Sequence, residues 1–108
     1  MTDTGSNESL TVEVDDSGTI IATGDIDLAG GPVLEAAILQ GENDQPITID
    51  LAGVVFIDSS GLRSLLGASR RAAERGTEVA LRSPSAEVLR LLEITGTASQ
   101  FRLEGSAG

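Results

Sequence analysis

The chain has 108 residues, 40% of them hydrophobic, and its 17 acids against 7 arginines give it a net charge of −10. That length suffices for one packed domain, while the absence of cysteine excludes disulfides and thiolate metal sites. The absence of histidine and lysine excludes a Ser-His-Asp triad and a Ser-Lys pair, and no glycine-rich nucleotide-binding motif is present.

The first quarter of the chain is predicted to hold a tail and a hairpin. Residues 1–9 are polar and are expected to form a flexible tail. Residues 10–14 alternate apolar and polar side chains, and residues 19–23 are again apolar, so the two segments are predicted to pair as a β-hairpin. Residues 24–27, Gly-Asp-Ile-Asp, are then expected to leave the second strand as a loop.

The middle of the chain is predicted to alternate helix and strand. Residues 31–41 form a helix with proline in its first turn, and residues 47–51 alternate as a strand does. The apolar run at residues 54–57 is expected to be a buried segment that leads into the next helix. That helix is predicted for residues 59–75, because its apolar side chains recur at spacings of three and four.

The last third is predicted to contain a strand at residues 78–82, a helix that Gly96 ends, and a short edge strand at residues 101–104. Residues 105–108 are expected to form a second flexible tail. Since no repeat or long linker interrupts the chain, residues 10–104 are predicted to be one domain. Strand–helix–strand alternation after a hairpin predicts the α/β class, with a mixed sheet of four to five strands and helices packed on one face.

The polar turn that follows the apolar run is the candidate site. Asp58 or Ser59 is placed to cap the helix that begins there. An anion at such a position is stabilised by the helix dipole, by roughly 0.3–1 kcal/mol when exposed. We therefore expect Ser59 to carry a phosphate without harm to its helix, with the first-turn N–H groups of Gly61 and Leu62 free to bind it.

The charge is distributed unevenly along the chain. Residues 1–58 hold 12 acids and no base, whereas residues 59–108 hold 5 acids and all 7 arginines. An acidic chain repels nucleic-acid phosphates and anionic membranes, so its natural partner is a basic protein surface. The alternative interpretation is that the negative charge only keeps the protein soluble. No apolar run has the length of a membrane span, and the amino terminus does not read as a secretory signal, so the cytosol is the expected compartment.

Several segments together resemble the STAS domains, and among them the stand-alone anti-sigma factor antagonists of bacteria. The resemblance covers about residues 10–103 and is carried by four ordered segments: residues 24–27, 47–62, 76–81 and 89–96. Two residues depart from the family pattern. Asp25 stands where the family often has glutamate, and Arg63 stands where it often has a small residue.

The resemblance implies a phosphorylation-gated binding protein. Such proteins bind an anti-sigma factor that is also a serine kinase, and so release a sigma factor. The kinase phosphorylates the serine after the motif aspartate, here Ser59, which abolishes binding until a serine phosphatase restores it. The partner contacts implied are Asp25, Asp27, Asp58, Ser60, Gly61 and Arg63, with no catalytic residue, metal or cofactor.

Two alternatives stay open. The chain could be a STAS-type scaffold in a larger signalling assembly that is never phosphorylated, with Ser59 and Ser60 only capping the helix. Alternatively, it could be a small metal-dependent enzyme, because carboxylates bind hard cations and three acids end or follow strands: Asp25, Asp27 and Asp58.

Overall fold

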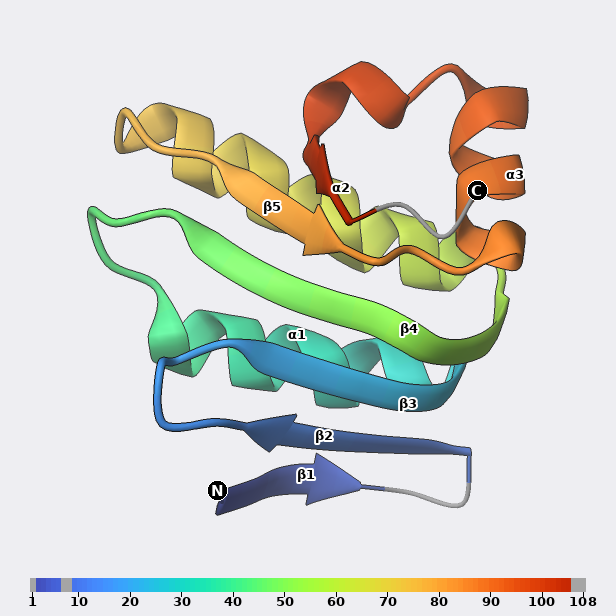
Figure 1. Cartoon of the computed structure of the whole chain (residues 1–108), viewed down its shortest axis with the longest axis horizontal. Helices are drawn as coiled ribbons and strands as arrows, with labels where there is room; N and C mark the ends of the chain where they lie inside the picture. The colour runs from blue at the N-terminus through green and yellow to red at the C-terminus, as the bar shows by residue number, and fades with distance from the viewer. Residues whose placement is uncertain (1, 7–8, 106–108) are drawn as a thin grey trace.

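Strand and helix alternate along the chain, as the apolar periodicity predicts. The computed structural model describes residues 2–6 and 9–105, and in this part of the chain it contains six strands, three α-helices and a short 3-10 helix. In chain order (Figure 1) these are β1 (Thr2–Ser6), β2 (Leu10–Val14), β3 (Ile20–Ile26), α1 (Gly30–Gly41), β4 (Ile47–Ile57), α2 (Ser59–Glu74), β5 (Val79–Arg82), α3 (Ala86–Thr95), η1 (Ala98–Gln100) and β6 (Arg102–Glu104).

The six strands form one mixed sheet in the order β1-β2-β3-β4-β5-β6. The β1–β2 and β2–β3 pairs are antiparallel, and the other three pairs are parallel. The predicted hairpin is confirmed, with Leu10 opposite Gly24 and Val14 opposite Ile20. Each parallel pair is joined by a helical crossover, which is the connection that parallel strands require.

A strand at the amino-terminal edge corrects the prediction of a flexible tail at residues 1–9. Thr2–Ser6 pairs antiparallel with β2, with Thr2 opposite Val14 and Ser6 opposite Thr11. Main-chain hydrogen bonds to an open sheet edge do not require an apolar sequence, so the pattern of side chains does not predict this strand. The sheet therefore has six strands rather than four or five; residues 1, 7 and 8, and residues 106–108 of the other predicted tail, lie outside the described residues.

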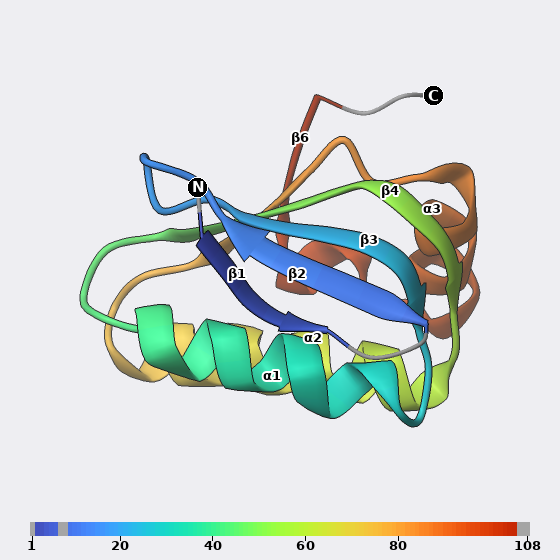
Figure 2. The same cartoon turned by 90° about the horizontal axis from the view of Figure 1, so that it is seen from below.

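Helices α1 and α2 lie side by side against one face of the sheet, and α3 lies at its end beside β4 (Figure 2). The core between these layers is aliphatic. Its largest fully buried side chains include Leu10, Ile26, Leu34, Ile38, Ile49, Leu51, Leu65, Leu81 and Leu92. On the opposite face, Asp50 of β4 lies beside Arg82 of β5 in the register. The predicted α/β class, with a mixed sheet and helices on one face, is confirmed.

The two central strands extend further than predicted, and this extension forms the base of the site. β4 continues without a break from Ile47 to Ile57. β3 includes Gly24, Asp25 and Ile26, so the prediction of a loop there was wrong. The register shifts at Gly24, whose φ of +113° favours glycine, and the Asp25 N–H donates to the Ser9 carbonyl over 2.8 Å.

Candidate functional site

The carboxylate of Asp58 caps α2. Its Oδ1 accepts hydrogen bonds from the N–H groups of Ser60, at 2.9 Å, and Gly61, at 3.0 Å. Its backbone is extended, with φ −115° and ψ −173°, as expected for a residue just outside a helix. Of the two caps that the sequence allows, the structure therefore selects Asp58, and Ser59 is the first helical residue.

The first-turn N–H groups were expected to be free, and this expectation was wrong. The Gly61 N–H bonds the Asp58 carboxylate, and the Leu62 N–H donates to the Asp58 carbonyl over 2.9 Å. The same aspartate that begins the helix thus satisfies the donors that an anion would use. A phosphate on Ser59 binds these groups only if it displaces Asp58.

Ser59 and Arg63 are the exposed polar side chains at the start of α2. The Ser59 hydroxyl has no hydrogen-bond partner among the described residues. Ser60 is half-buried, and its carbonyl accepts from the buried Ser64 hydroxyl at 3.4 Å. Ser59 is therefore open to an enzyme, whereas Ser60 faces partly into the helix packing.

Gly61 is buried, and its expected role as a partner contact stays a prediction. A Cβ on this residue would lie 2.7 Å from Ile26 Cγ2 and closer still to the Ile26 carbonyl oxygen. The Asp58 N–H donates to that same carbonyl over 3.3 Å. Glycine is required here because the first turn of α2 packs directly on the end of β3.

Asp25 and Asp27 lie at the same end of the sheet as Ser59, where the parallel strands β3 and β4 both finish (Figure 1). Asp25 is within β3, beside Phe56 of β4 in the register, rather than in a loop. Asp27 Oδ1 accepts hydrogen bonds from Ala29 N–H, at 3.1 Å, and from Gly30 N–H, at 2.7 Å, at the entry to α1. The structure thus brings these acids to the Ser59 end of the molecule, with Asp27 also serving as a structural cap.

The three acids Asp25, Asp27 and Asp58 do not converge on a metal site. Among the described residues, no group of three or more acids could hold a metal ion. The carboxylates of Asp27 and Asp58 are instead engaged by main-chain N–H groups of two different helix starts. The alternative of a metal-dependent enzyme built on these three acids is therefore not supported by the geometry.

Exposed apolar side chains flank the polar residues, and the sequence reasoning missed them. Leu28 is 77% exposed, Val55 67% and Phe56 47%. The apolar run 54–57 was expected to be buried, but within it Val54 and Ile57 face the core. We call this surface the Ser59 edge and define it as Asp25, Asp27, Leu28, Val55, Phe56, Asp58, Ser59, Ser60 and Arg63.

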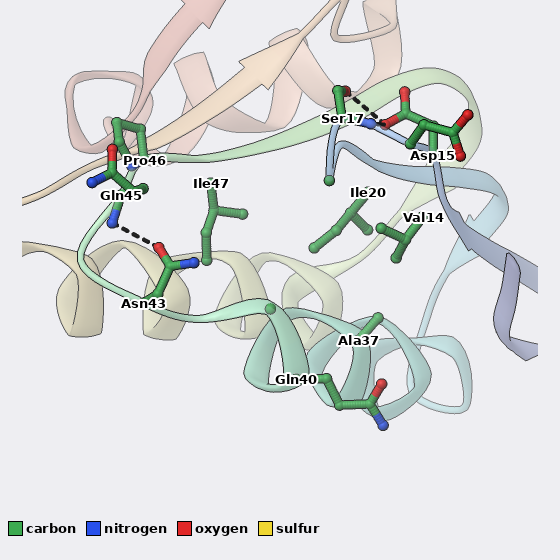
Figure 3. A pocket seen from close by; sticks show the side chains of 13 residues that line it. Val14, Asp15, Ser17, Ile20, Ala37, Gln40, Asn43, Gln45, Pro46 and Ile47 are labelled. Carbon is green, nitrogen blue, oxygen red and sulfur yellow. Dashed lines mark hydrogen bonds between the residues drawn. The ribbon is translucent and has the colours of Figure 1, made fainter. Parts of the chain in front are cut away.

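A cavity of about 620 Å³ opens at the other end of the sheet (Figure 3). Val14, Ile20 and Ile47 contribute to its apolar wall, and Asp15 lies at its polar rim. The Ser17 hydroxyl donates to Asp15 over 2.7 Å and holds the pKa of that carboxyl below its usual value. Since the length of β4 separates this cavity from Ser59, it is not part of the candidate site.

The cap can be tested by substitution. Asp58→Ala is expected to lower the free energy of unfolding by about 0.5–2 kcal/mol, because the N–H groups of Ser60 and Gly61 lose their acceptor. Asp58→Asn keeps a side-chain oxygen and is expected to cost less. Urea denaturation at neutral pH compares the two variants, and equal losses would show that the charge of Asp58, rather than its hydrogen bonds, stabilises the helix start.

Comparison with known proteins identifies the family. The family model described as "Mlab, STAS domain" matches residues 9–103, so the chain belongs to the STAS domain family, and the resemblance seen in the sequence is confirmed. Within the described residues, no helix has the length and apolar character needed to cross a membrane.

Similar proteins include anti-sigma factor antagonists. An anti-sigma-B factor antagonist of Listeria monocytogenes is 28% identical over 106 residues, 93% of each chain. The solved structure of an anti-sigma factor antagonist from Mycobacterium paratuberculosis matches with TM-score 0.74 and 26% identity, over 92% of this chain and 86% of that one. The anti-sigma factor antagonist SpoIIAA matches in its unphosphorylated form with TM-score 0.66 and 23% identity, over 88% and 87% of the two chains, and a phosphorylated form of SpoIIAA also matches.

Proposed function

We propose that this protein is an anti-sigma factor antagonist whose binding is gated by phosphorylation of Ser59. In its unmodified form it binds an anti-sigma factor that is also a serine kinase, and so frees a sigma factor. The kinase then transfers the γ-phosphoryl group of ATP to the Ser59 oxygen, and the loss of binding follows. The observation that carries the proposal is the exposed, unengaged hydroxyl of Ser59 among the described residues, at the first position of α2.

The Ser59 edge has the composition of a docking surface. Its apolar side chains, Leu28, Val55 and Phe56, are exposed, and Phe56 lies beside Asp25 in the register of β3 and β4. Apolar anchors with charged neighbours suit a protein partner, and the acids favour a basic surface on it. This combination supports a regulatory binding protein, in which the phosphoryl-transfer chemistry belongs to the kinase.

The relatives support the same reading. The Listeria and Mycobacterium proteins and SpoIIAA are all named as anti-sigma factor antagonists, and SpoIIAA has been solved in both phosphorylation states. A serine phosphatase then completes the cycle by removing the phosphate from Ser59. A kinase that uses ATP and a sigma factor that binds RNA polymerase imply that the protein acts in the cytoplasm.

The test uses Ser59→Ala with Ser60→Ala as its matched control. Each protein is mixed with the purified cognate anti-sigma kinase, with and without Mg-ATP; calorimetry follows binding and mass spectrometry locates the phosphate. The parent and Ser60→Ala are expected to bind, to gain one phosphate at residue 59, and to be released. Ser59→Ala is expected to bind equally well and to remain bound in ATP, because it offers no hydroxyl to the kinase.

The outcomes separate the alternatives. Release of Ser59→Ala by ATP, or a phosphate found on Ser60, would overturn the assignment of the phosphoacceptor. A parent protein that binds its partner, gains no phosphate and stays bound in ATP would instead support the non-phosphorylated STAS scaffold.

A further inference from the structure

Arg63 is an exposed cation one helical turn beyond Ser59. It is the first base in the sequence, since residues 1–58 contain neither arginine nor lysine. It forms no ion pair with any residue that the structure describes. Its guanidinium is therefore available to an anion that appears nearby.

The helix directs Arg63 toward Ser59. Both residues lie in α2 at positions i and i+4, where Cβ atoms are roughly 5–6 Å apart on one face. Helical side chains lean toward the amino terminus of their helix, so position 63 lets an arginine reach over the turn that Ser59 begins. Arg70 continues the same face but lies about 16 Å from Ser59 along the axis, at 1.5 Å per residue.

A phosphate on Ser59 needs a cation, because its other surroundings are acidic or already occupied. Asp58 precedes it directly and takes the N–H groups of Ser60 and Gly61. Asp25 and Asp27 lie at the same edge. Three of the other arginines are engaged elsewhere: Arg71 and Arg75 pair with Glu42, at 2.6 and 3.2 Å, and Arg102 pairs with Glu78 and Glu104.

We propose that Arg63 binds the phosphate of phosphorylated Ser59 within the same helix, as a charge-assisted clasp between residues i and i+4. This inference rests on the proposed phosphorylation of Ser59. The guanidinium donates hydrogen bonds to the phosphate oxygens and offsets the repulsion from Asp58. Arg63 is thereby a positioning residue of the modified state, because it fixes where the phosphate is presented to the phosphatase.

The test installs phosphoserine at position 59 during translation, so that it depends on no kinase. Phosphorus NMR then measures the second pKa of the phosphoserine in the parent, Arg63→Gln, Arg63→Lys and Arg70→Gln proteins. Because Arg63 favours the dianion, Arg63→Gln is expected to raise this pKa by roughly 0.3–0.7. Arg63→Lys keeps the charge and should recover part of the difference, and Arg70→Gln should leave the value unchanged.

A second measurement reports the contact itself. In the phosphorylated parent the Arg63 Nε–H resonance is expected to move from its position in the unmodified protein, and the movement should shrink in 1 M NaCl. An unmoved Arg63 resonance together with an unchanged pKa in Arg63→Gln would overturn the clasp and leave the proposed gating intact. Equal pKa changes in Arg63→Gln and Arg70→Gln would overturn the clasp as well, since both changes would then reflect the overall electrostatic field of the protein rather than a contact with Arg63. Failure of the proposed function appears separately, as an unmodified Ser59 in the kinase experiment.

Discussion

Gly61→Ala is expected to lower the free energy of unfolding by about 3 kcal/mol, the upper end of the usual cost of overpacking. The added methyl group would lie 2.7 Å from Ile26 Cγ2 and 3.0 Å from Ile26 Cβ, and would press on the Ile26 carbonyl. Because part of this obstacle is backbone, a change of rotamer cannot relieve it. The end of β3 and the first turn of α2 must separate, which also strains the hydrogen bond from Asp58 to Ile26.

Gly67→Ala is the matched control, since it adds the same atom to the same helix. A Cβ there would meet only the flexible end of Arg71, at 3.3 Å. Alanine is a better helix former than glycine, so this variant is expected to gain up to about 1 kcal/mol. Urea denaturation measures both variants. A stabilised Gly61→Ala would show that the contact between α2 and β3 is looser than the structure has it.

Periodicity predicted the elements whose side chains face the core. The hairpin of β2 and β3 and the amphipathic α2 follow from spacings of two and of three to four, because burial selects those side chains directly. The αL glycine at Gly96, φ +69°, ends α3 as predicted. Asp58 was one of two candidate caps, and its selection depends on a local hydrogen bond that the sequence suggests.

Tertiary contacts decided what the sequence could not. β1 pairs through its main chain, so its polar side chains resembled a tail. β4 continues past Leu51 without strict alternation, and it exposes both Val55 and Phe56 in a run that was expected to be buried. The packing of Gly61 on Ile26 joins residues 35 positions apart in the chain. The occupied first-turn donors have a local cause instead, because the Asp58 side chain takes the N–H groups of Ser60 and Gly61 once it is the cap.

Phosphoserine at position 59 is expected to weaken binding of the anti-sigma kinase by at least about 100-fold. A dianion would enter a contact that already contains Asp58 and lies beside Asp25 and Asp27. A like charge in a desolvated interface costs several kcal/mol of binding free energy. A loss of about 2.7 kcal/mol is enough to weaken the affinity 100-fold. Calorimetry with the unmodified and the phosphorylated protein measures the ratio.

The matched control carries phosphoserine at Ser99, which is exposed in η1; the adjacent Gln100 carbonyl accepts from the Ser69 hydroxyl of α2, about 15 Å from Ser59 along the helix axis at 1.5 Å per residue. It adds the same charge to the same protein, so its affinity loss measures the effect of net charge alone. We expect this loss to be less than tenfold, because exposed charges farther apart than a Debye length are largely screened. A loss at Ser99 equal to that at Ser59 would contradict a local gate.

The switch is expected to act without a change of fold. The Ser59 side chain is exposed, so its phosphate requires no burial, and Asp58 still caps the helix. Repulsion from Asp58 and attraction to the helix dipole are each about 1 kcal/mol or less at the surface and oppose each other. The thermal midpoint should therefore change by less than about 8 °C. Backbone NMR shifts should change near residues 56–63. Shift changes spread through the sheet and α3 would favour an allosteric mechanism, because a surface repulsion of this size does not perturb distant parts of the fold.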